Sequence, residues 1–363
     1  MSLSEDIYLK VAKVLDKLPN GFPTTETGVE IQLLKKVFQP HEADLFCDLR
    51  LTFETPEQIA ERTGRPIEGL SDQLKAMWKN GQIFGIDFGE VQVYKLLPWV
   101  FGIYEFQLNR MDKEFAELCE SYAPVFGKQF FHNKPQLMQV LPIEHEIQHN
   151  QEALPYERVS SIIEKGQSFA VNVCICKKEK ELLDSPCQKP VEVCMAIAPV
   201  PGVFEGNHPW GGRVINKQEA YDILQKAEEA GLVHMTSNVV NDQFYICNCC
   251  GCCCGVLRSI NEFGITDAVN SHYYAVIDEN QCSSCGVCAN ERCQVNAIEE
   301  SDTAYRIIQN KCIGCGLCIT TCPSDAIQLI RKKPEECITP PNDEKEWFDK
   351  RAELRGVDYS KYR

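Results

Sequence analysis

The sequence contains no run of about 18 uninterrupted apolar residues, which a membrane-spanning helix would require. The first ten residues, MSLSEDIYLK, are acidic and polar and lack the apolar segment of a secretory signal peptide. Nicotinamide and flavin fingerprints are also missing, as is a nucleophile paired with a base. We therefore expect a cytoplasmic protein without a transmembrane segment, and we assign no catalytic residue.

An excess of basic charge is missing as well. The chain has 37 Lys and Arg against 52 Asp and Glu, a formal net charge of -15, which argues against nucleic acid as a general partner. Its 363 residues are enough for two to four domains, with a core that needs no covalent crosslinks. Some other purpose must therefore account for the 21 cysteines.

The cysteines fall into two groups, with ten in residues 174–254, eight in residues 282–322, and three elsewhere, at Cys47, Cys119 and Cys337. Disulfides explain them poorly, because a disulfide joins Cα atoms about 4.4–6.8 Å apart with facing Cβ vectors, which adjacent residues rarely provide. In a reducing cytoplasm, clustered cysteines indicate metal or redox sites.

The clearest internal repeat pairs AVIDENQCSSCGVCANERCQVNAI (275–298) with RIIQNKCIGCGLCITTCPSDAI (306–327). Each copy starts with a short β-like run, continues into a Cys-x2-Cys-x2-Cys loop, and leaves through a fourth cysteine. This repeat resembles a bacterial-type ferredoxin domain with two [4Fe-4S] clusters. In such domains the fourth cysteine of each motif binds the cluster of the other motif.

The resemblance implies two ligand groups. One is Cys282, Cys285, Cys288 and Cys322, and the other is Cys312, Cys315, Cys318 and Cys293. The first motif departs from the family: four residues separate Cys288 from Cys293, and Gln294 stands where proline is usual. We expect a bulge to absorb the extra residue. A structural zinc ribbon is the alternative, and two tandem triplets with two remote cysteines fit it badly.

A second cysteine-rich segment precedes this repeat. It begins as Cys174-x-Cys176-x10-Cys187-x6-Cys194, and the later run YICNCCGCCCGVL (245–257) supplies Cys247, Cys249, Cys250, Cys252, Cys253 and Cys254. Between them we expect a helix, with Asn216 as N-cap, Gly231 just past its end, and an apolar face formed by Ala220, Ile223, Leu224 and Ala227. This helix would fold the two cysteine segments onto each other.

The central cysteines predict at least one further [4Fe-4S] cluster. The simplest ligand group is Cys174, Cys176, Cys187 and Cys194, with a second cluster in 247–254 or one that draws ligands from both segments. Structural zinc at one or both places stays open. The region resembles uncharacterised cysteine-rich ferredoxin-like proteins of anaerobic bacteria, a resemblance that implies no reaction. Heterodisulfide reductases share only the richness in cysteine.

Residues 41–99 resemble a winged helix. TPEQIAERTG predicts a helix with Thr55 as N-cap and Gly64 as its stop, a second helix follows over 65–81, and IFGIDFGEVQVYKLL predicts a hairpin. Residues 1–100 carry 11 basic and 15 acidic side chains, without the basic stripe of a DNA reader. We therefore expect packing or partner docking here, and no nucleic acid partner.

The histidines and the C-terminal tail show two further patterns. HEIQH (145–149) matches the zinc-peptidase signature, but no third ligand follows and Pro155 is near, so we interpret it as a polar linker. His208 and His234 are expected to be structural. In the tail, EKEWFDKRAELRG predicts a short helix whose Trp347, Phe348 and Leu354 need an apolar surface, either on this chain or on a partner.

The sequence thus predicts an α+β multidomain protein. Its expected parts are a winged-helix-like domain (1–105), a linker with connecting helices (106–160), a cysteine-rich iron-sulfur module (161–272), a dicluster ferredoxin domain (273–332) and a C-terminal tail (333–363). The leading hypothesis is single-electron transfer through [4Fe-4S] clusters, two C-terminal and one or two central, with redox partner proteins in a larger complex. The alternatives are a reductase acting at 247–254 and a winged-helix iron-sulfur sensor.

Overall fold

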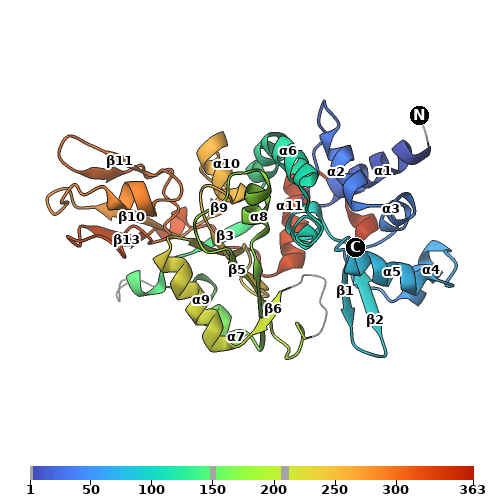
Figure 1. Ribbon diagram of the computed structural model, residues 1–363. Coiled ribbons are helices and arrows are strands. Elements are labelled where there is room, and N and C mark those ends of the chain that lie inside the picture. The colour runs from blue at the N-terminus through green and yellow to red at the C-terminus, as the bar shows by residue number, and fades with distance from the viewer. Residues whose placement is uncertain (1–2, 148–152, 206–211) are drawn as a thin grey trace.

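The computed structural model describes residues 3–147, 153–205 and 212–363. Its three parts follow one another along the long direction of the molecule (Figure 1). A mostly helical N-terminal part occupies one end, a mixed sheet with helices on both sides forms the middle, and the cysteine repeat forms the other end. The expected mixture of helices and strands is confirmed.

The N-terminal part contains helices and one hairpin. They are α1 (Leu3–Lys17), α2 (Val29–Val37), α3 (Pro40–Phe46), α4 (Pro56–Thr63), α5 (Leu70–Lys79), β1 (Phe84–Asp87) and β2 (Gln92–Lys95). The expected boundaries of α4 are confirmed: Thr55 accepts a hydrogen bond from the Gln58 amide, and Gly64 ends the helix at a φ of 72°. The order of α4, α5 and the antiparallel hairpin agrees with the expectation, and the winged-helix assignment stays a prediction.

Residues 106–160 do more than link domains. Helix α6 (Lys113–His132) buries Phe115, Tyr122 and Phe130 in a hydrophobic core that runs without interruption from α1 to the central part. Strand β3 (Met138–Leu141) then joins the central sheet. The sequence reading missed β3 because four residues, buried at every position, show no alternation of polar and apolar side chains.

The central sheet has the strand order β6-β4-β5-β8-β7-β3-β9, with antiparallel neighbours except for the parallel pair β3 and β9. Its strands are β4 (Ser168–Val173), β5 (Glu192–Ala198), β6 (Arg213–Ile215), β7 (Val233–Ser237), β8 (Tyr245–Cys249) and β9 (Val269–Asn270), together with β3. The helices of this part are α7 (Val159–Lys165), α8 (Ile175–Leu182), α9 (Lys217–Glu229) and α10 (Gly255–Phe263).

The two faces of this sheet carry different side chains. Phe169, Met195 and Ile246 point to one face and form a core with α7 and α9. The predicted N-cap Asn216, the buried face of α9 and the left-handed Gly231 are confirmed. Because side chains alternate along a strand, Cys194 and Cys247 point to the opposite face, the side of α8 and α10.

The C-terminal repeat forms two antiparallel pairs. Strand β10 (Tyr273–Ile277) pairs with β13 (Ile327–Arg331), and β11 (Ile298–Glu300) pairs with β12 (Tyr305–Ile307). The cysteine loops lie between these strands. The extra residue after Cys288 is absorbed in a π-helical turn, in which the Cys293 amide donates to the Cys288 carbonyl at 3.0 Å. A local bulge of this kind was expected.

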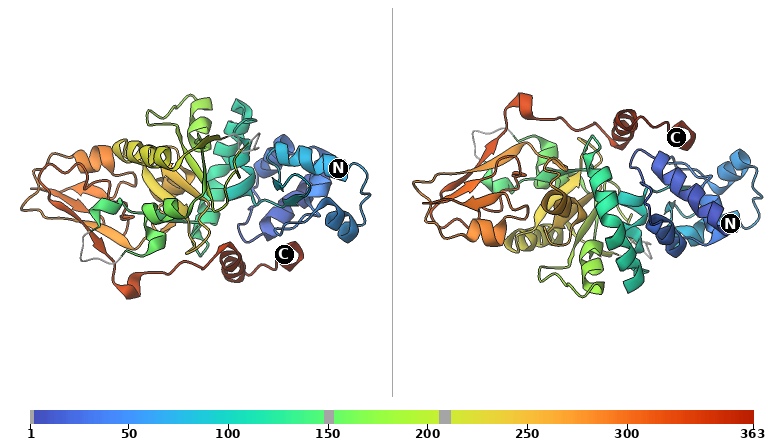
Figure 2. Two further views of the ribbon diagram at one scale, coloured as in Figure 1. Left: turned by 90° about the horizontal axis from the view of Figure 1, so that it is seen from below. Right: turned by 90° about the horizontal axis from the view of Figure 1, so that it is seen from above.

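The tail returns along the molecule. Figure 2 shows it running from the cysteine repeat past the central part to the N-terminal part, where α11 (Glu344–Arg355) and the C-terminus lie. Trp347 is buried and donates to the Gln136 carbonyl, and Arg351 donates to the carbonyls of Phe130 and Pro135. The apolar surface that α11 required is therefore on this chain, although Leu354 stays exposed.

Candidate metal centres

Six thiols gather on the α8 and α10 side of the sheet. We call Cys174, Cys176, Cys194, Cys247, Cys249 and Cys254 the inner set. Cys194 lies on β5, and Cys247 and Cys249 lie on the neighbouring strand β8, two residues apart and on one face. Cys174 follows the end of β4, which pairs with the other edge of β5. Four of these cysteines therefore lie close together on, or directly after, three adjacent strands.

Contacts between the thiols hold the inner set together. The side chains interact in pairs, Cys174 with Cys176, Cys194 with Cys247, Cys247 with Cys249, and Cys249 with Cys254. Electrostatic interactions of Cys176 with Cys254 and Cys249 close the group. The hydrogen bond from Cys176 lowers the pKa of Cys174 to about 7, with help from the Lys177 backbone amide, whereas burial opposes it.

Two helices begin at the inner set. Cys174 is the N-cap of α8, and Cys254 is the N-cap of α10. The free amides and the positive dipole end of a helix favour anions, so both helix starts suit thiolates and the anionic clusters that thiolates hold. Nearby, the Tyr104 hydroxyl donates to Glu179 at 2.6 Å, and burial raises the pKa of Glu179 to about 7.

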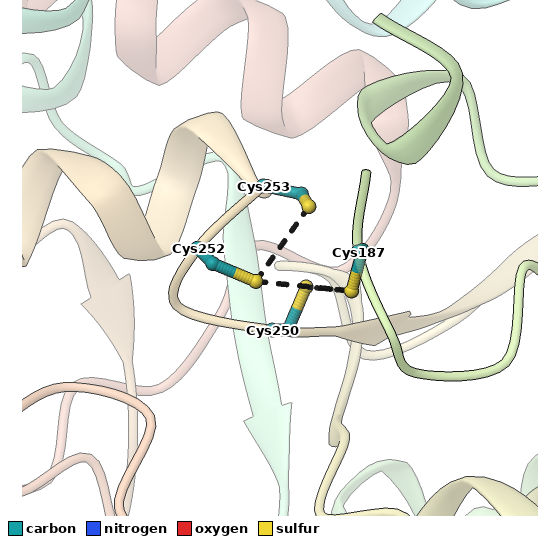
Figure 3. A group of neighbouring side chains, drawn as sticks. All are labelled: Cys187, Cys250, Cys252 and Cys253. Carbon is teal, nitrogen blue, oxygen red and sulfur yellow. Dashed lines mark hydrogen bonds between the residues drawn. The ribbon is translucent and has the colours of Figure 1, made fainter. Parts of the chain in front are cut away.

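Four other thiols form a much tighter group, which we call the compact set. It consists of Cys187, Cys250, Cys252 and Cys253. The Cys187 Sγ atom lies 3.7 Å from that of Cys250 and 3.8 Å from that of Cys252, and the Cys252 and Cys253 Sγ atoms are 3.6 Å apart. Figure 3 shows the four sulfurs pointing toward one another, with Cys187 contributed by the segment after α8 and the others by the loop between β8 and α10.

The compact set corrects the simplest grouping expected from the sequence, in which Cys187 joined Cys174, Cys176 and Cys194. The reason is the alternation of side chains at the end of β8. Cys249 faces the inner set, whereas the next residue, Cys250, packs with Val193 and Ala227 toward α9. Cys187 also packs there, and Cys174 and Cys176 border the same cluster. Both sets therefore draw ligands from both cysteine segments, an arrangement that the sequence left open.

One thiol of the compact set ionises readily. A hydrogen bond from Cys253 lowers the pKa of Cys250 to about 5, with help from Cys252 and the Lys177 ammonium group, whereas burial opposes it. Burial and the Cys250 charge in turn raise the pKa of Cys252 to about 12. A bound metal cation would displace the remaining protons, because thiolates are the metal-ligating form.

The C-terminal repeat brings its cysteines together as the family resemblance implies. Cys282, Cys285, Cys288 and Cys322, the distal set, line one pocket together with Tyr305 and Ile327. In the proximal set, Cys293, Cys312, Cys315 and Cys318, burial and the neighbouring Cys293 and Cys312 raise the pKa of Cys315 to about 12. Cysteines at these positions fit [4Fe-4S] cubes, which four thiolates hold.

Backbone amides donate to the sulfurs of the proximal set. The Ala275 amide lies 3.3 Å from the Cys312 Sγ atom, and the Ala297 amide lies 3.2 Å from the Cys293 Sγ atom. Such bonds stabilise negative charge on sulfur and so tune a cluster's reduction potential. The Cys315 carbonyl also accepts from the Ile143 amide of the central part, so the proximal set borders the junction of the two parts.

Gln294, the residue that replaces the usual proline, makes this junction. Its side-chain oxygen accepts a hydrogen bond from the Gly251 amide at 3.1 Å, and its carbonyl accepts from Asn261 at 3.0 Å. A Cβ atom on Gly251 would lie 2.1 Å from the Gln294 carbonyl oxygen, so only glycine fits there. The sequence reading noted the departure at Gln294 but missed its role.

Arg292 also stabilises this junction between the repeat and the central part. Its buried guanidinium donates to the carbonyls of Glu228 and Glu229 at the end of α9. It also donates to the Leu317 carbonyl and to the Thr320 hydroxyl within the repeat. A positive charge at a helix C-terminus is favourable, and the planar guanidinium serves four acceptors at once.

Among the residues that the structure describes, no histidine joins a group of converging metal-ligating side chains. His234 is buried against Asn248, and burial lowers its pKa to about 4, so it is a neutral structural residue. His145 lies in a short turn beside Glu146 and Glu228. His149, the second histidine of HEIQH, and His208 lie outside the described residues.

Comparisons with known proteins agree with this picture of the repeat. In the described part of the chain, no helix has the length and apolar character to cross a membrane. An uncharacterized ferredoxin of Methanocaldococcus jannaschii is 35% identical over 99 residues, which cover 27% of this chain and 58% of that protein. The chain thus matches less than two thirds of that relative's length. Residues 275–329 match the family model of the 4Fe-4S dicluster domain, and the chain carries [4Fe-4S] clusters.

Proposed function

We propose that this protein transfers single electrons between redox partner proteins, from the distal set through the proximal set to the inner set. [4Fe-4S] clusters bound to cysteine supply the one-electron exchange. The observation that carries the proposal is the position of the proximal set. It borders the central part through Ile143. Gln294, beside its ligand Cys293, contacts Gly251 in the loop between Cys249 and Cys254.

The two ends of this route differ in exposure. Cys285 of the distal set is exposed, so a soluble donor or acceptor can approach it closely. Cys249 and Cys254 of the inner set are buried, and two helix starts and three strands enclose that set. An exposed entry and a buried end suit a protein that receives electrons at one place and delivers them elsewhere.

The N-terminal part supports a partner-docking role in this proposal. We interpret it as a winged-helix-like domain whose surface carries exposed apolar side chains, Phe53, Ile67, Phe88 and Val91. Acidic residues outnumber basic ones there, which favours a protein partner over nucleic acid. The partner would be another component of a larger redox complex. Binding of the protein to random or promoter DNA at physiological salt is expected to be absent.

Iron and sulfide quantification on anaerobically purified protein tests the proposal. Three cluster-binding sets predict about 12 iron atoms per chain, together with paramagnetic signals after reduction with dithionite. Rapid mixing with a reduced one-electron donor should reduce the exposed end first and the inner set later. A colourless protein, or one without a paramagnetic signal after reduction, would contradict it.

One observation favours a second candidate, a reductase with chemistry at the inner set. Six thiols exceed the four that one cubane needs, so two remain for a dithiol reaction or for an unusual cluster. Reductive titration distinguishes the candidates. Electron transfer alone predicts only one-electron steps, whereas a dithiol and disulfide couple adds one two-electron step.

A further inference from the structure

We propose that the compact set binds a single tetrahedral zinc ion and not a [4Fe-4S] cluster. The proposal goes beyond the electron-transfer function, because zinc has no redox chemistry and the ion would serve as a structural crosslink. The compact set is Cys187, Cys250, Cys252 and Cys253, and its four Sγ atoms all lie within 4.8 Å of one another.

The sulfur spacing carries the argument. In a tetrahedral site with Zn–S bonds of about 2.3 Å, neighbouring sulfurs lie about 3.8 Å apart. Three of the six Sγ–Sγ distances in the compact set are 3.6, 3.7 and 3.8 Å, and the other three lie within 4.8 Å. These distances are also far longer than the ~2.05 Å of a disulfide bond, so the group is four separate thiols. Four sulfurs at this spacing surround the volume of one ion.

The ferredoxin cysteines provide an internal comparison. Each thiolate around a cubane binds a different iron atom, so the sulfurs must stand farther apart than around one ion. Within residues 3–147, 153–205 and 212–363, the compact set is the only group of metal-ligating side chains that converges within 4.8 Å. The distal and proximal sets, which suit cubanes, do not converge in this way. The inner set does not either.

The surroundings suit a closed structural site. Four thiolates without a water position are the donor group of structural zinc, and soft sulfur ligands exclude calcium and magnesium. Cys252 is exposed, which gives the ion a path of entry, whereas Cys250 and Cys253 are buried. The Lys177 ammonium, itself buried, interacts with Cys250 and offsets part of the negative charge of a four-thiolate site.

The ion would tie together two loops that flank the paired strands β5 and β8. Cys187 lies between α8 and β5, and the other ligands lie in the loop between β8 and α10. This loop also carries Gly251, which contacts Gln294, and it ends at Cys254 of the inner set. A crosslink here would hold the loop in the conformation on which both the junction and the inner set depend.

Metal analysis of the whole protein, purified without oxygen, tests the inference with Cys187→Ser and Cys337→Ser as a matched pair. Cys337 is a half-buried cysteine outside every set. We expect about one zinc per chain in the unchanged protein and in Cys337→Ser, and almost none in Cys187→Ser, with iron and sulfide unchanged in all three. X-ray absorption at the zinc edge of the unchanged protein should give four sulfur neighbours at about 2.3 Å.

The outcomes separate this inference from the proposed function. Loss of about four iron and four sulfide from Cys187→Ser, without zinc in the unchanged protein, would overturn it and place a cubane here. Loss of one iron without sulfide would overturn zinc and keep the single-ion geometry. If Cys187→Ser does not fold, the absorption measurement decides alone, because iron or mixed nitrogen and sulfur neighbours would overturn the inference. Electron transfer through the other sets can hold or fail in every case.

Discussion

The proximal set and the compact set both use four cysteines, but the spacing of those cysteines along the chain differs. Three of the four proximal cysteines come from one loop with fixed spacing, Cys312, Cys315 and Cys318. Three of the four compact cysteines are also close in sequence, but they are adjacent or nearly so, and the fold sorts them away from their neighbours Cys249 and Cys254. Spacing along the chain therefore identifies the cysteines that belong together in the proximal set, whereas the fold decides which neighbours belong together in the compact set.

The comparison also separates what each region contributes. A repeated Cys-x2-Cys-x2-Cys loop carries its own geometry, so the ferredoxin part needs little from the rest of the chain to place its ligands. The central cysteines depend on a seven-stranded sheet that brings Cys194 of β5 beside Cys247 of β8. Changes outside the cysteines should therefore disturb the central sets more than the ferredoxin sets.

The largest expected effect follows from removing a ligand of the inner set. Cys254→Ala should lose about four of about 12 iron atoms per chain, because Cys254 caps α10 and contacts Cys249 within that set. Zinc and the signals of the two ferredoxin clusters should remain. Iron, sulfide and zinc quantification with electron paramagnetic resonance measures all of these.

Cys119→Ala is the matched control for Cys254→Ala. Cys119 is buried on α6 near Glu179 but belongs to no set, so iron content should not change. Unchanged iron in both variants would show that Cys254 is not a cluster ligand, because the other five thiols of the inner set are enough for one cubane.

A smaller effect is expected where the two regions meet. In Gly251→Ala the new Cβ atom would lie 2.1 Å from the Gln294 carbonyl oxygen, a backbone atom that cannot move away easily. We expect the free energy of local opening at residues 250–254 to fall by about 2–3 kcal/mol. Hydrogen exchange with mass spectrometry under anaerobic conditions measures it.

Gly255→Ala tests whether this effect is steric. No atom lies within 4 Å of a Cβ placed on Gly255, which is the first residue of α10. Alanine there should leave local opening unchanged or make it harder by up to about 1 kcal/mol. Equal exchange rates in both variants would show that the contact between Gly251 and Gln294 does not stabilise this loop.

The contrast between the ferredoxin part and the central sets also explains which features of the structure could be predicted from the sequence. The 4Fe-4S dicluster domain, the caps Thr55 and Asn216, and the buried face of α9 were predictable, because each depends on residues close in sequence. The grouping of Cys187 with Cys250 depends on strand order and on which face each residue of β8 presents. Neither is encoded locally, so a list of cysteines alone cannot divide ten ligands into two sets.

Gln294 shows that a departure from a family pattern can be informative. Glutamine stands at position 294, where the family usually has proline. In the structure, the glutamine binds Gly251 through its side chain and Asn261 through its carbonyl. The departure is a signal of contact with the central part, and the contact itself could not be inferred before the partner surface was known.

Arg292→Lys should have a smaller effect on stability than Gly251→Ala. Lysine keeps the positive charge but lacks the planar fork that serves four acceptors, including the Glu228 and Glu229 carbonyls. We expect the opening of the junction to become easier by about 2 kcal/mol, with cluster content unchanged. Hydrogen exchange at the end of α9 and in residues 288–294 reports it. Arg306→Lys, at an exposed pair with Glu299, should change nothing.

The smallest effect should come from the other end of α9. Asn216 caps this helix by accepting from the Glu219 amide at 2.9 Å, and Asn216→Ala should cost about 1 kcal/mol of helix stability. Because this end lies away from Arg292 and from every cysteine set, iron, sulfide and zinc should stay at their original levels. Asn216→Asp keeps the cap and should behave like the original protein. Metal content is measured together with hydrogen exchange of α9. A loss of metal in Asn216→Ala would mean that the whole helix, and not only its C-terminal end, supports the central sets. The two regions would then be less independent than their cysteine patterns indicate.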